Sequence, residues 1–362
     1  MSPPPGPGGS DGGSAGDADD RSGPVDADGA VEAGDAAGPG LGSGPADTDP
    51  GPGDPDPGDP GPGDPGPGEA SPGEAGTIRW RMTVAYDGSS FHGFAAQHDQ
   101  RTVAGALAEA LGRVVRAPVA LTCAGRTDSG VHALAQVVHF DVPVRLAGHL
   151  DPKAVVSSCN SQLGPAIVVR DAEVAPPGFD ARHSATARRY RYLVVNAPVA
   201  DPLLAGLTWH VADPLDLRSL AAASDALLGE HDFRAFCRRV PGTSPDDPIP
   251  RRVTAASWTE LSRAAGDPGI HPSRPAAPAA GSTPALVPAV GSLLAFEIEA
   301  NAFCHQMVRS LVGTLVDVGR GRKRPSDILW ILRSADRQQA AQPAPPWGLT
   351  LTEVRYGAGR LA

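Results

Sequence analysis

The first 76 residues of this 362-residue chain cannot contribute to a folded core, because half of them are glycine or proline and none is aromatic. Ordering such a segment costs backbone entropy that its small apolar surface cannot offset. The run GPGDPDPGDPGPGDPGPGE lacks a sustained glycine at every third position, which argues against a collagen helix. We therefore predict a disordered tail over residues 1–76 and a folded region over residues 77–362, long enough for one large domain or two joined ones.

Charge is divided unevenly between these two regions. The tail holds 16 acidic residues and one arginine, whereas residues 77–362 hold 30 basic and 25 acidic residues. The negative net charge of the whole chain, −10, therefore comes from the tail, and the folded region is mildly basic. A mild positive charge permits an anionic partner such as nucleic acid, but it also suits an ordinary solvated surface.

The four cysteines, Cys123, Cys159, Cys237 and Cys304, include no C-x-x-C pair. We predict reduced thiols rather than disulfides or a zinc site, as is usual in an intracellular protein. The acidic, proline-rich N-terminus does not resemble a signal peptide, and no apolar run reaches membrane-spanning length. These features predict a soluble, cytoplasmic protein.

Apolar periodicity predicts two units that each read strand, helix, strand, strand, which suggests a loose duplication of an α+β unit. In the first unit, residues 103–115 predict a helix with Thr102 as its N-cap. A further helix is predicted in AFCHQMVRSLVGTLVDVGRG after the second unit. Its buried stripe would contain Phe303 and Met307, with His305 and Arg309 on the other side. The predicted strands are TIRWRMTVAY, APVALTCAG, ALAQVVHFDV, ARRYRYLVVN, RRVTAASWTEL and SLLAFEIEANAF, and the second unit's helix is DLRSLAAASDALLG.

A glycine-flanked turn, CAGRTDSGVHA, lies between two of these strands at residues 123–133. Most aspartates in turns only bond their own backbone, so a structural role is the simple interpretation of Asp128. TDSG does not predict a serine nucleophile, because only His132 lies near it. His132, His139 and Asp141 do not predict a metal site, because no further ligand is indicated. The turn residues alone therefore leave Asp128 without an assigned chemistry.

Six segments in order resemble the tRNA pseudouridine synthase A family. The turn is similar to the family motif G-R-T-D-A-G-V-H, with Ser129 in place of alanine. One short motif could arise by chance, but so many in the family's order do not. The other five segments are YDGSSFHGF (86–94), RTVAGALAEAL (101–111), FDARHSATARRYRY (179–192), NAFCHQMVRSLVGTL (301–315) and APPWGLTLTEVRY (344–356).

The resemblance implies an α+β fold of two similar subdomains. Their mostly antiparallel sheets would join into one extended sheet, with helices on one side and a catalytic cleft between the subdomains. The implied boundaries are an N-terminal catalytic subdomain over residues 77–186 and a C-terminal subdomain over residues 187–362. The Ala- and Pro-rich segment at residues 262–290 is expected to be a mobile insertion in a hairpin loop.

The resemblance also implies an isomerase that converts uridine to pseudouridine at positions 38, 39 and 40 of the tRNA anticodon arm, as a homodimer. Such an isomerisation requires no cofactor and no metal. Two alternatives are a pseudouridine synthase for another RNA and a non-catalytic RNA-binding protein. Intact Asp128, Tyr190 and Arg309 argue against the second alternative.

Four residues take roles from the resemblance. Asp128 matches the essential carboxylate, which acts as a nucleophile or as a base at the sugar. Arg309 matches the arginine that pairs with this carboxylate, and Tyr190 matches the tyrosine that stacks on the target base. Arg126 would contact RNA and occupy the space that the extracted base leaves. Without the resemblance, Arg126 is a phosphate-binding or surface arginine, Tyr190 a core tyrosine and Arg309 a solvated helix residue.

One segment departs from the family pattern, and several other residues have only general expected roles. The family's G-W-x-R-Q segment is replaced by Gly93-Phe94-Ala95-Ala96-Gln97, which removes a basic residue where RNA contact is common. Gly125 and Gly130 would relax the backbone of the turn. Phosphate contacts in an RNA groove are expected from some of the arginines Arg182, Arg188, Arg189, Arg191, Arg251 and Arg252.

Overall fold

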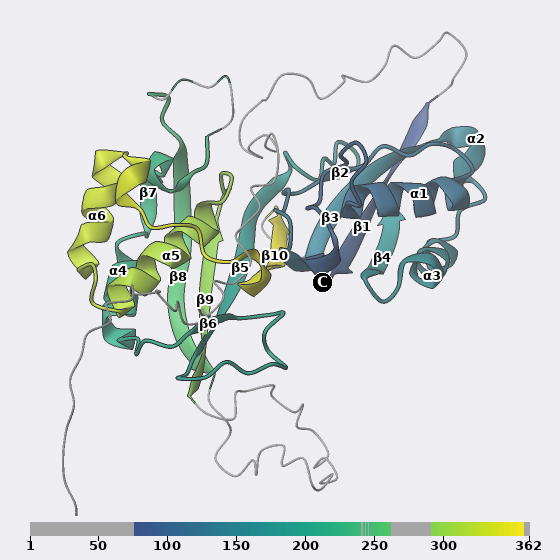
Figure 1. Ribbon diagram of the computed structural model, residues 1–362. Coiled ribbons are helices and arrows are strands. Elements are labelled where there is room, and N and C mark those ends of the chain that lie inside the picture. Colours follow the sequence, from purple (N-terminus) through teal and green to yellow (C-terminus); the bar gives the residue numbers. More distant parts are fainter. Residues whose placement is uncertain (1–75, 240–241, 243, 245, 262–290, 358–362) are drawn as a thin grey trace, which may run out of the picture. The chain divides into compact units, whose positions relative to one another are not determined.

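A computed structural model describes residues 76–239, 242, 244, 246–261 and 291–357 of the chain (Figure 1). The predicted tail, apart from residue 76, and the predicted insertion at 262–290 lie outside the described residues. The strands are β1 (Thr77–Tyr86), β2 (Thr122–Cys123), β3 (His132–Pro143), β4 (Ile167–Val174), β5 (Ala185–Asn196), β6 (Trp209–Val211), β7 (Gly229–Asp232), β8 (Pro250–Leu261), β9 (Ser292–Ala300) and β10 (Leu349–Tyr356). The helices are α1 (Val103–Val115), α2 (Val144–Ala147), α3 (Pro152–Leu163), α4 (Leu217–Asp225), α5 (Met307–Gly319) and α6 (Pro325–Ser334), with 3-10 turns η1 (Gly88–Ser90), η2 (Arg234–Phe236), η3 (Arg337–Gln339) and η4 (Pro346–Gly348).

One mixed sheet runs through both predicted halves, in the order β4-β1-β3-β10-β5-β9-β8-β7. β2 pairs with β3 and β6 pairs with β5 at the side of this path. All neighbours on the path are antiparallel except β10 and β3, which are parallel. The α+β class with one extended, mostly antiparallel sheet is therefore confirmed, and the division at residue 186 stays a prediction.

The C-terminal strand β10 joins the two halves of the sheet, as Figure 1 shows between β3 and β5. Its residue Leu351 pairs with Ala133 at the start of β3 on one side and with Tyr190 on the other. The end of the CAGRTDSGVHA turn and the RRYRY strand are thus held one strand apart. This spacing is what places residues of the two halves around one site.

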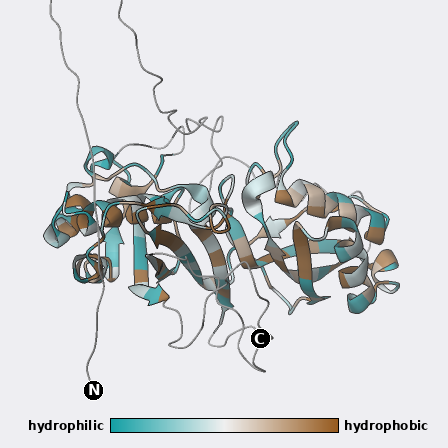
Figure 2. Ribbon diagram, turned by 60° about the horizontal axis from the view of Figure 1, so that its bottom comes forward, coloured by the Kyte–Doolittle hydropathy of each residue, from teal (hydrophilic) through white to brown (hydrophobic). Residues whose placement is uncertain are grey.

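Amphipathic strands and helices enclose the core. On β1, the side chains of Trp80, Met82 and Val84 are buried at alternate positions, as the sequence predicts for a half-buried strand. α1 buries Leu107 and Leu111, and its N-cap Thr102 accepts a hydrogen bond from a backbone N–H of the first turn. Figure 2 shows the apolar and polar bands alternating along the strands. None of the helices in the described ranges is long and apolar enough to cross a membrane.

Candidate active site

A pocket with an empty volume of about 710 Å³, open to solvent, lies where the two halves of the sheet meet. The CAGRTDSGVHA turn contributes one wall, and the segment that leads into α5 contributes another. The charged and titratable side chains in its lining are Arg126, Asp128, Arg188, Tyr190, His305 and Arg309.

The turn that carries Asp128 is packed tightly against the segment after β1. Gly130 has a φ of +76°, which favours glycine, whereas Gly125 does not have a positive φ. A Cβ atom on Gly88 would lie 2.0 Å from the carbonyl oxygen of Val131, so only glycine fits there. The YDGSSFHGF segment therefore shapes the turn by close backbone contact, a role that the sequence did not reveal.

Buried polar groups hold the turn in place. The Tyr86 hydroxyl and the Thr127 hydroxyl are 2.8 Å apart, and Gln136 donates a 2.6 Å hydrogen bond to the carbonyl of Gly125. The Nδ1 atom of His132 accepts from the N–H of Gly88 at 3.1 Å. These bonds tie the backbone on both sides of Asp128 to buried side chains.

Asp128 projects into the pocket with its side chain 21 % exposed and its two oxygens in different contacts. Oδ2 accepts a 3.1 Å hydrogen bond from Nη1 of Arg309, and Oδ1 lies 3.5 Å from Nε2 of His305. The hydrogen bond from the arginine limits the rotation of the carboxylate. A carboxylate held in this way, yet partly open to solvent, can reach a bound nucleotide.

Arg309 differs from its predicted setting. The sequence places it on a polar face of a helix, but α5 is buried on nearly all sides and Arg309 itself is buried. Its Nε donates a 2.7 Å hydrogen bond to the carbonyl of Ala344, and a Cβ on Gly313 would lie 2.1 Å from the carbonyl of Gln342. The chain before β10 therefore packs directly on α5 and orients the guanidinium toward Asp128.

Helix α5 also begins later than the sequence predicts. Phe303 and His305 precede it, and the helix starts at Met307 after Gln306 adopts a left-handed conformation with φ +60°. Phe303 satisfies the apolar spacing of a helix because it is buried in the loop, where it packs edge-on against Tyr190 with ring centroids 5.1 Å apart. The apolar spacing at Phe303 therefore reflects burial in the loop and not a helical conformation.

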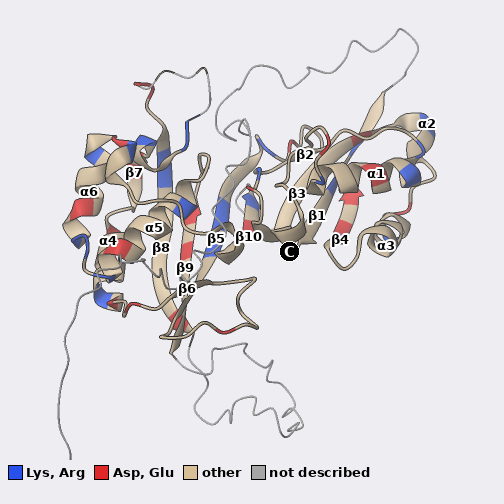
Figure 3. Ribbon diagram, viewed as in Figure 1, with Lys and Arg blue, Asp and Glu red and all other residues tan. Residues whose placement is uncertain are grey.

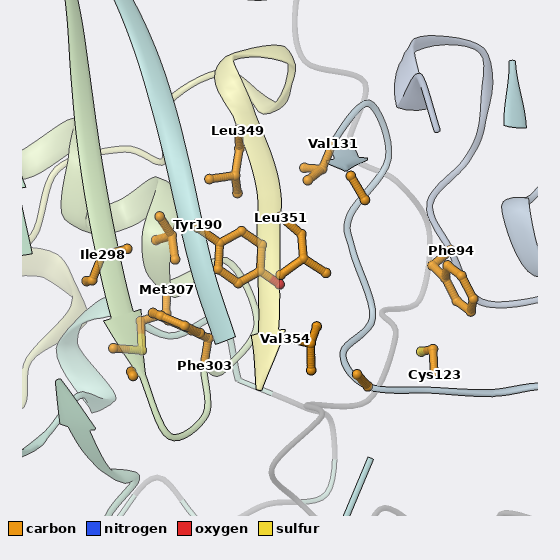
Figure 4. Close-up of a cluster of buried hydrophobic side chains, with 14 of the residues drawn as sticks. Phe94, Cys123, Val131, Tyr190, Ile298, Phe303, Met307, Leu349, Leu351 and Val354 are labelled. Atoms are coloured by element: carbon orange, nitrogen blue, oxygen red, sulfur yellow. The ribbon is translucent and has the colours of Figure 1, made fainter. Parts of the chain in front are cut away.

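Tyr190 is buried on β5 and also lines the pocket. Figure 4 shows its ring beside Leu349, Leu351, Phe303 and Met307. Burial raises the pKa of Tyr190, so the phenol keeps its proton at neutral pH. Tyr192 is instead fully buried and donates a 2.7 Å hydrogen bond to the carbonyl of Pro345, which is the role of a core tyrosine.

The other two arginines that line the pocket, Arg126 and Arg188, have contrasting surroundings. Arg126 is half-buried and forms no hydrogen bond or ion pair within the described ranges. Arg188 is buried, and its five N–H groups donate to backbone carbonyls: two bonds to Ala124 and one each to Arg182, Ala185 and Asn301. Arg126 is free to meet an anion, whereas Arg188 holds protein segments together.

Most other arginines that the sequence suggested for an RNA groove face carboxylates. Arg189 lies 2.7 Å from Glu299, and Arg252 lies 2.9 Å from Glu230. Arg191 pairs with Glu297 in the same way. Two of these pairs join the neighbouring strands β5 and β9, where Figure 3 shows basic and acidic residues side by side, and the third joins β8 to β7. Any phosphate contact by these three arginines would compete with an ion pair.

The prediction of four reduced cysteines is wrong for two of them. Cys237 and Cys304 form a disulfide, with Cα atoms 5.7 Å apart, whereas Cys123 and Cys159 are buried free thiols. The two bonded residues are separated by 67 positions, so only the fold brings them together. The bond ties the chain after η2 to the residue that precedes His305.

The described residues contain no group of three or more His, Cys, Asp or Glu side chains that could hold a metal ion. The histidines of the turn and of β3 are engaged otherwise. His132 bonds the backbone of Gly88 and Trp347, and the Nδ1 atom of His139 accepts from the N–H of Ala181. Asp141 is paired with Arg79 at 2.8 Å.

Two pocket residues have other surroundings than the sequence suggested. His305 was expected only on a polar helix face, and Arg188 was one of the arginines from which phosphate contacts in an RNA groove were expected. The available signal for His305 was its position four residues before Arg309 in NAFCHQMVRS. No sequence signal indicated that Arg188 bonds four separate carbonyls.

Comparison with known proteins gives consistent matches. The family described as tRNA pseudouridine synthase matches residues 82–183 and 223–357. A tRNA pseudouridine synthase A of Frankia casuarinae is 41% identical over 285 residues, which cover 78% of this chain and 90% of the relative. The protein of the same name from Bifidobacterium animalis is 40% identical over 296 residues, covering 77% and 94%, and that of Idiomarina loihiensis is 37% identical over 282 residues, covering 77% and 93%.

Proposed function

The chain belongs to the tRNA pseudouridine synthase family, and from this premise we propose that it isomerises uridine to pseudouridine at positions 38, 39 and 40 of the tRNA anticodon arm. It is an isomerase, and tRNA is its substrate. The reaction moves the sugar from N1 of uracil to C5, so substrate and product have the same atoms. The proposal also places the enzyme in the cytoplasm as a homodimer that binds one anticodon arm across both subunits.

The observation that carries the proposal is the setting of Asp128, a partly exposed carboxylate in an open pocket with Arg309 on one of its oxygens. In this proposal, the carboxylate acts at the sugar of the target uridine, as a nucleophile on C1′ or as a base. Arg309 holds the carboxylate in position through its hydrogen bond to Oδ2. The ion pair of Asp128 and Arg309 lies in a partly dehydrated site, where such a pair is stronger than in bulk water.

In this proposal, Tyr190 and Arg126 bind the target nucleotide. A stacked uridine must leave the helix before a side chain can reach its sugar. Tyr190 would then stack on the extracted uracil, since it lines the pocket beside Asp128, and Arg126 would occupy the vacated space. The free guanidinium of Arg126 suits contact with RNA phosphates or base edges.

Replacement of Asp128 by asparagine tests the proposal. Asp128→Asn should release no tritium above background from 5-tritiated-uridine tRNA, while its affinity for that tRNA stays within about threefold, because an amide keeps the shape but cannot act as a nucleophile or base. The matched control is Asp225→Asn, an exposed residue on α4, which should retain wild-type turnover.

Turnover by Asp128→Asn would refute the catalytic role of this carboxylate. Pseudouridine mapping in the product tRNA tests the rest of the proposal. Modification by the wild-type enzyme outside positions 38 to 40 would refute the choice of site.

A further inference from the structure

Arg101 presents an exposed guanidinium group beside the turn that carries Asp128. Its Cζ atom lies over the face of the Phe91 ring, 4.6 Å from the ring centroid. The carbonyl of Phe91 in turn accepts hydrogen bonds from the hydroxyl of Ser129 at 3.3 Å and from the N–H of Gly130 at 3.4 Å. Phe91 therefore connects Arg101 with the two residues that directly follow Asp128.

Within the described residues, no carboxylate pairs with this guanidinium, and the side chain of Arg101 donates no hydrogen bond. The acidic residues nearby along the chain have other partners. Asp99 lies 2.7 Å from His98, and Asp87 accepts a 3.0 Å hydrogen bond from the N–H of Ser89. The first turn of α1, which begins two residues after Arg101, contains no acidic residue. The charge of Arg101 is therefore available to an anion.

Other donors at this side of the turn are already used. The first three N–H groups of α1 donate to the carbonyls of Gly93 and Phe94 and to the hydroxyl of Thr102, so the helix N-terminus itself offers no anion site. The sequence from residue 82 to residue 112 contains no other arginine or lysine. Arg101 is thus the cationic group that this segment can offer beside the turn.

A nucleotide bound in the pocket has a phosphate on each side of its sugar. Asp128 lines the pocket, whereas Arg101 lies outside the lining and beside the turn, where a phosphate next to the target suits it better than the base does. A guanidinium can donate two parallel hydrogen bonds to one phosphate, and a position over a ring leaves its in-plane N–H groups free. The ring also limits the rotamers of the long side chain, so binding costs less entropy.

We propose that Arg101 binds a phosphate that flanks the target uridine of the tRNA, with the ring of Phe91 as its platform. The inference rests on the proposed function and adds a substrate-binding residue to it. The contact is the same before and during the reaction. Its loss therefore lowers affinity and raises KM, while kcat stays within about twofold of wild type.

The salt dependence of tRNA binding measures this contact. We would determine the Kd of the full-length wild-type protein and of each variant for one tRNA at several KCl concentrations. Arg101→Gln should bind about 5- to 30-fold more weakly than wild type at low salt. The slope of log affinity against log salt should fall in magnitude by about 0.7 to 0.9, the value for one phosphate. Arg101→Lys should keep the slope, because it keeps the charge, and lose only part of the affinity.

Arg116→Gln is the matched control, because Arg116 is exposed at the other end of α1. The 13 residues of this helix separate the two arginines by about 20 Å. The control removes the same charge and should keep the wild-type slope and a Kd within about twofold of wild type. The urea midpoint of each variant shows whether it is folded.

A neutral linkage in the tRNA locates the phosphate. The tRNA would carry one methylphosphonate on the 5′ or on the 3′ side of the uridine that the wild-type enzyme isomerises. One of these two linkages should weaken binding by wild type about as much as Arg101→Gln does. The same linkage should leave binding by Arg101→Gln unchanged, because both changes remove one contact.

Three results would overturn the inference. They are wild-type affinity and slope in Arg101→Gln, an equal loss in Arg116→Gln, and linkages that weaken binding by wild type and by Arg101→Gln equally. None of them touches the proposed function, which fails only if the wild-type enzyme forms no pseudouridine in the anticodon arm. The salt measurement needs no turnover, so it decides the role of Arg101 even in that case.

Discussion

Replacement of Arg188 by methionine should destabilise the protein far more than the same change elsewhere on strand β5. The five N–H groups of Arg188 donate at 2.7 to 3.1 Å to four backbone carbonyls, which lie in the CAGRTDSGVHA turn, in the loop before β5, at the first residue of β5 and in the loop after β9. Burial lowers the pKa of Arg188, yet the guanidinium stays cationic at neutral pH. Methionine keeps most of the apolar stem and removes every donor.

The magnitude follows from the acceptors that are left behind. A buried carbonyl without a donor costs about 1–3 kcal/mol, so four such carbonyls would cost at least about 4 kcal/mol. Relief of the buried charge and entry of water offset part of this loss. We therefore expect Arg188→Met to lower the free energy of unfolding by about 3–5 kcal/mol, a large part of the stability of an ordinary domain.

Urea unfolding followed by circular dichroism measures this loss, with Arg191→Met as the control. Arg191 lies on the same strand, and its ion pair with Glu297 is exposed, so its replacement should cost at most about 1 kcal/mol. Arg188→Lys should fall between the two, because an ammonium has three donors for four carbonyls. Equal losses for Arg188→Met and Arg191→Met would refute the reasoning.

Two further outcomes are expected. Tyr190→Phe should keep the stacking surface and stay within about threefold of wild-type kcat/KM in the tritium-release assay. Tyr190→Leu should lose the 1–3 kcal/mol of base stacking, about 5- to 150-fold; equal losses in the two variants would assign the effect to the hydroxyl. Arg79 lowers the pKa of Asp141 through a hydrogen bond, so the pair stabilises the folded state above the unfolded pKa near 4 and loses this effect as the pH falls through the folded pKa. Asp141→Asn should therefore be less stable than wild type by at most about 1 kcal/mol at pH 7, because the pair is partly exposed. The two proteins should converge in stability as the pH falls through the folded pKa of Asp141, as measured by urea unfolding.

Strong local patterns in the sequence predicted much of the sheet. β1, β3, β5 and the hairpin of β8 with β9 follow from alternation, and α1 follows from its stripe and its N-cap. The sequence gives less warning of α3, whose buried residues are only Val155 and Cys159. A helix that buries so little lacks the periodic stripe on which such predictions depend.

At the start of α5 the sequence predicts helix where the structure has a loop. This helix is buried on nearly all sides, so its sequence does not distinguish a core face from a polar face. Burial of Phe303 in the preceding loop then extends the apparent stripe toward the N-terminus. The left-handed turn at Gln306 depends on tertiary contacts and has no glycine to signal it.

The candidate site was predicted by resemblance rather than by spacing. Asp128 and Arg309 are 181 positions apart, and nothing in the composition of either segment requires them to meet. The resemblance also gave no partner to the second oxygen of Asp128, which lies near His305. Nor did it indicate the disulfide that fixes the chain before His305, since its two cysteines meet only in the folded protein.

Strand β10 explains why the site needs both ends of the folded region. Asp128 comes from the first half of the sheet, whereas Tyr190, His305 and Arg309 come from the second. β10 lies between these halves, and the segment before it bonds Arg309 through Ala344. We therefore expect the pocket to form only when the last strand is in place, so a chain that stopped before β10 should carry all four of these side chains and still lack the site.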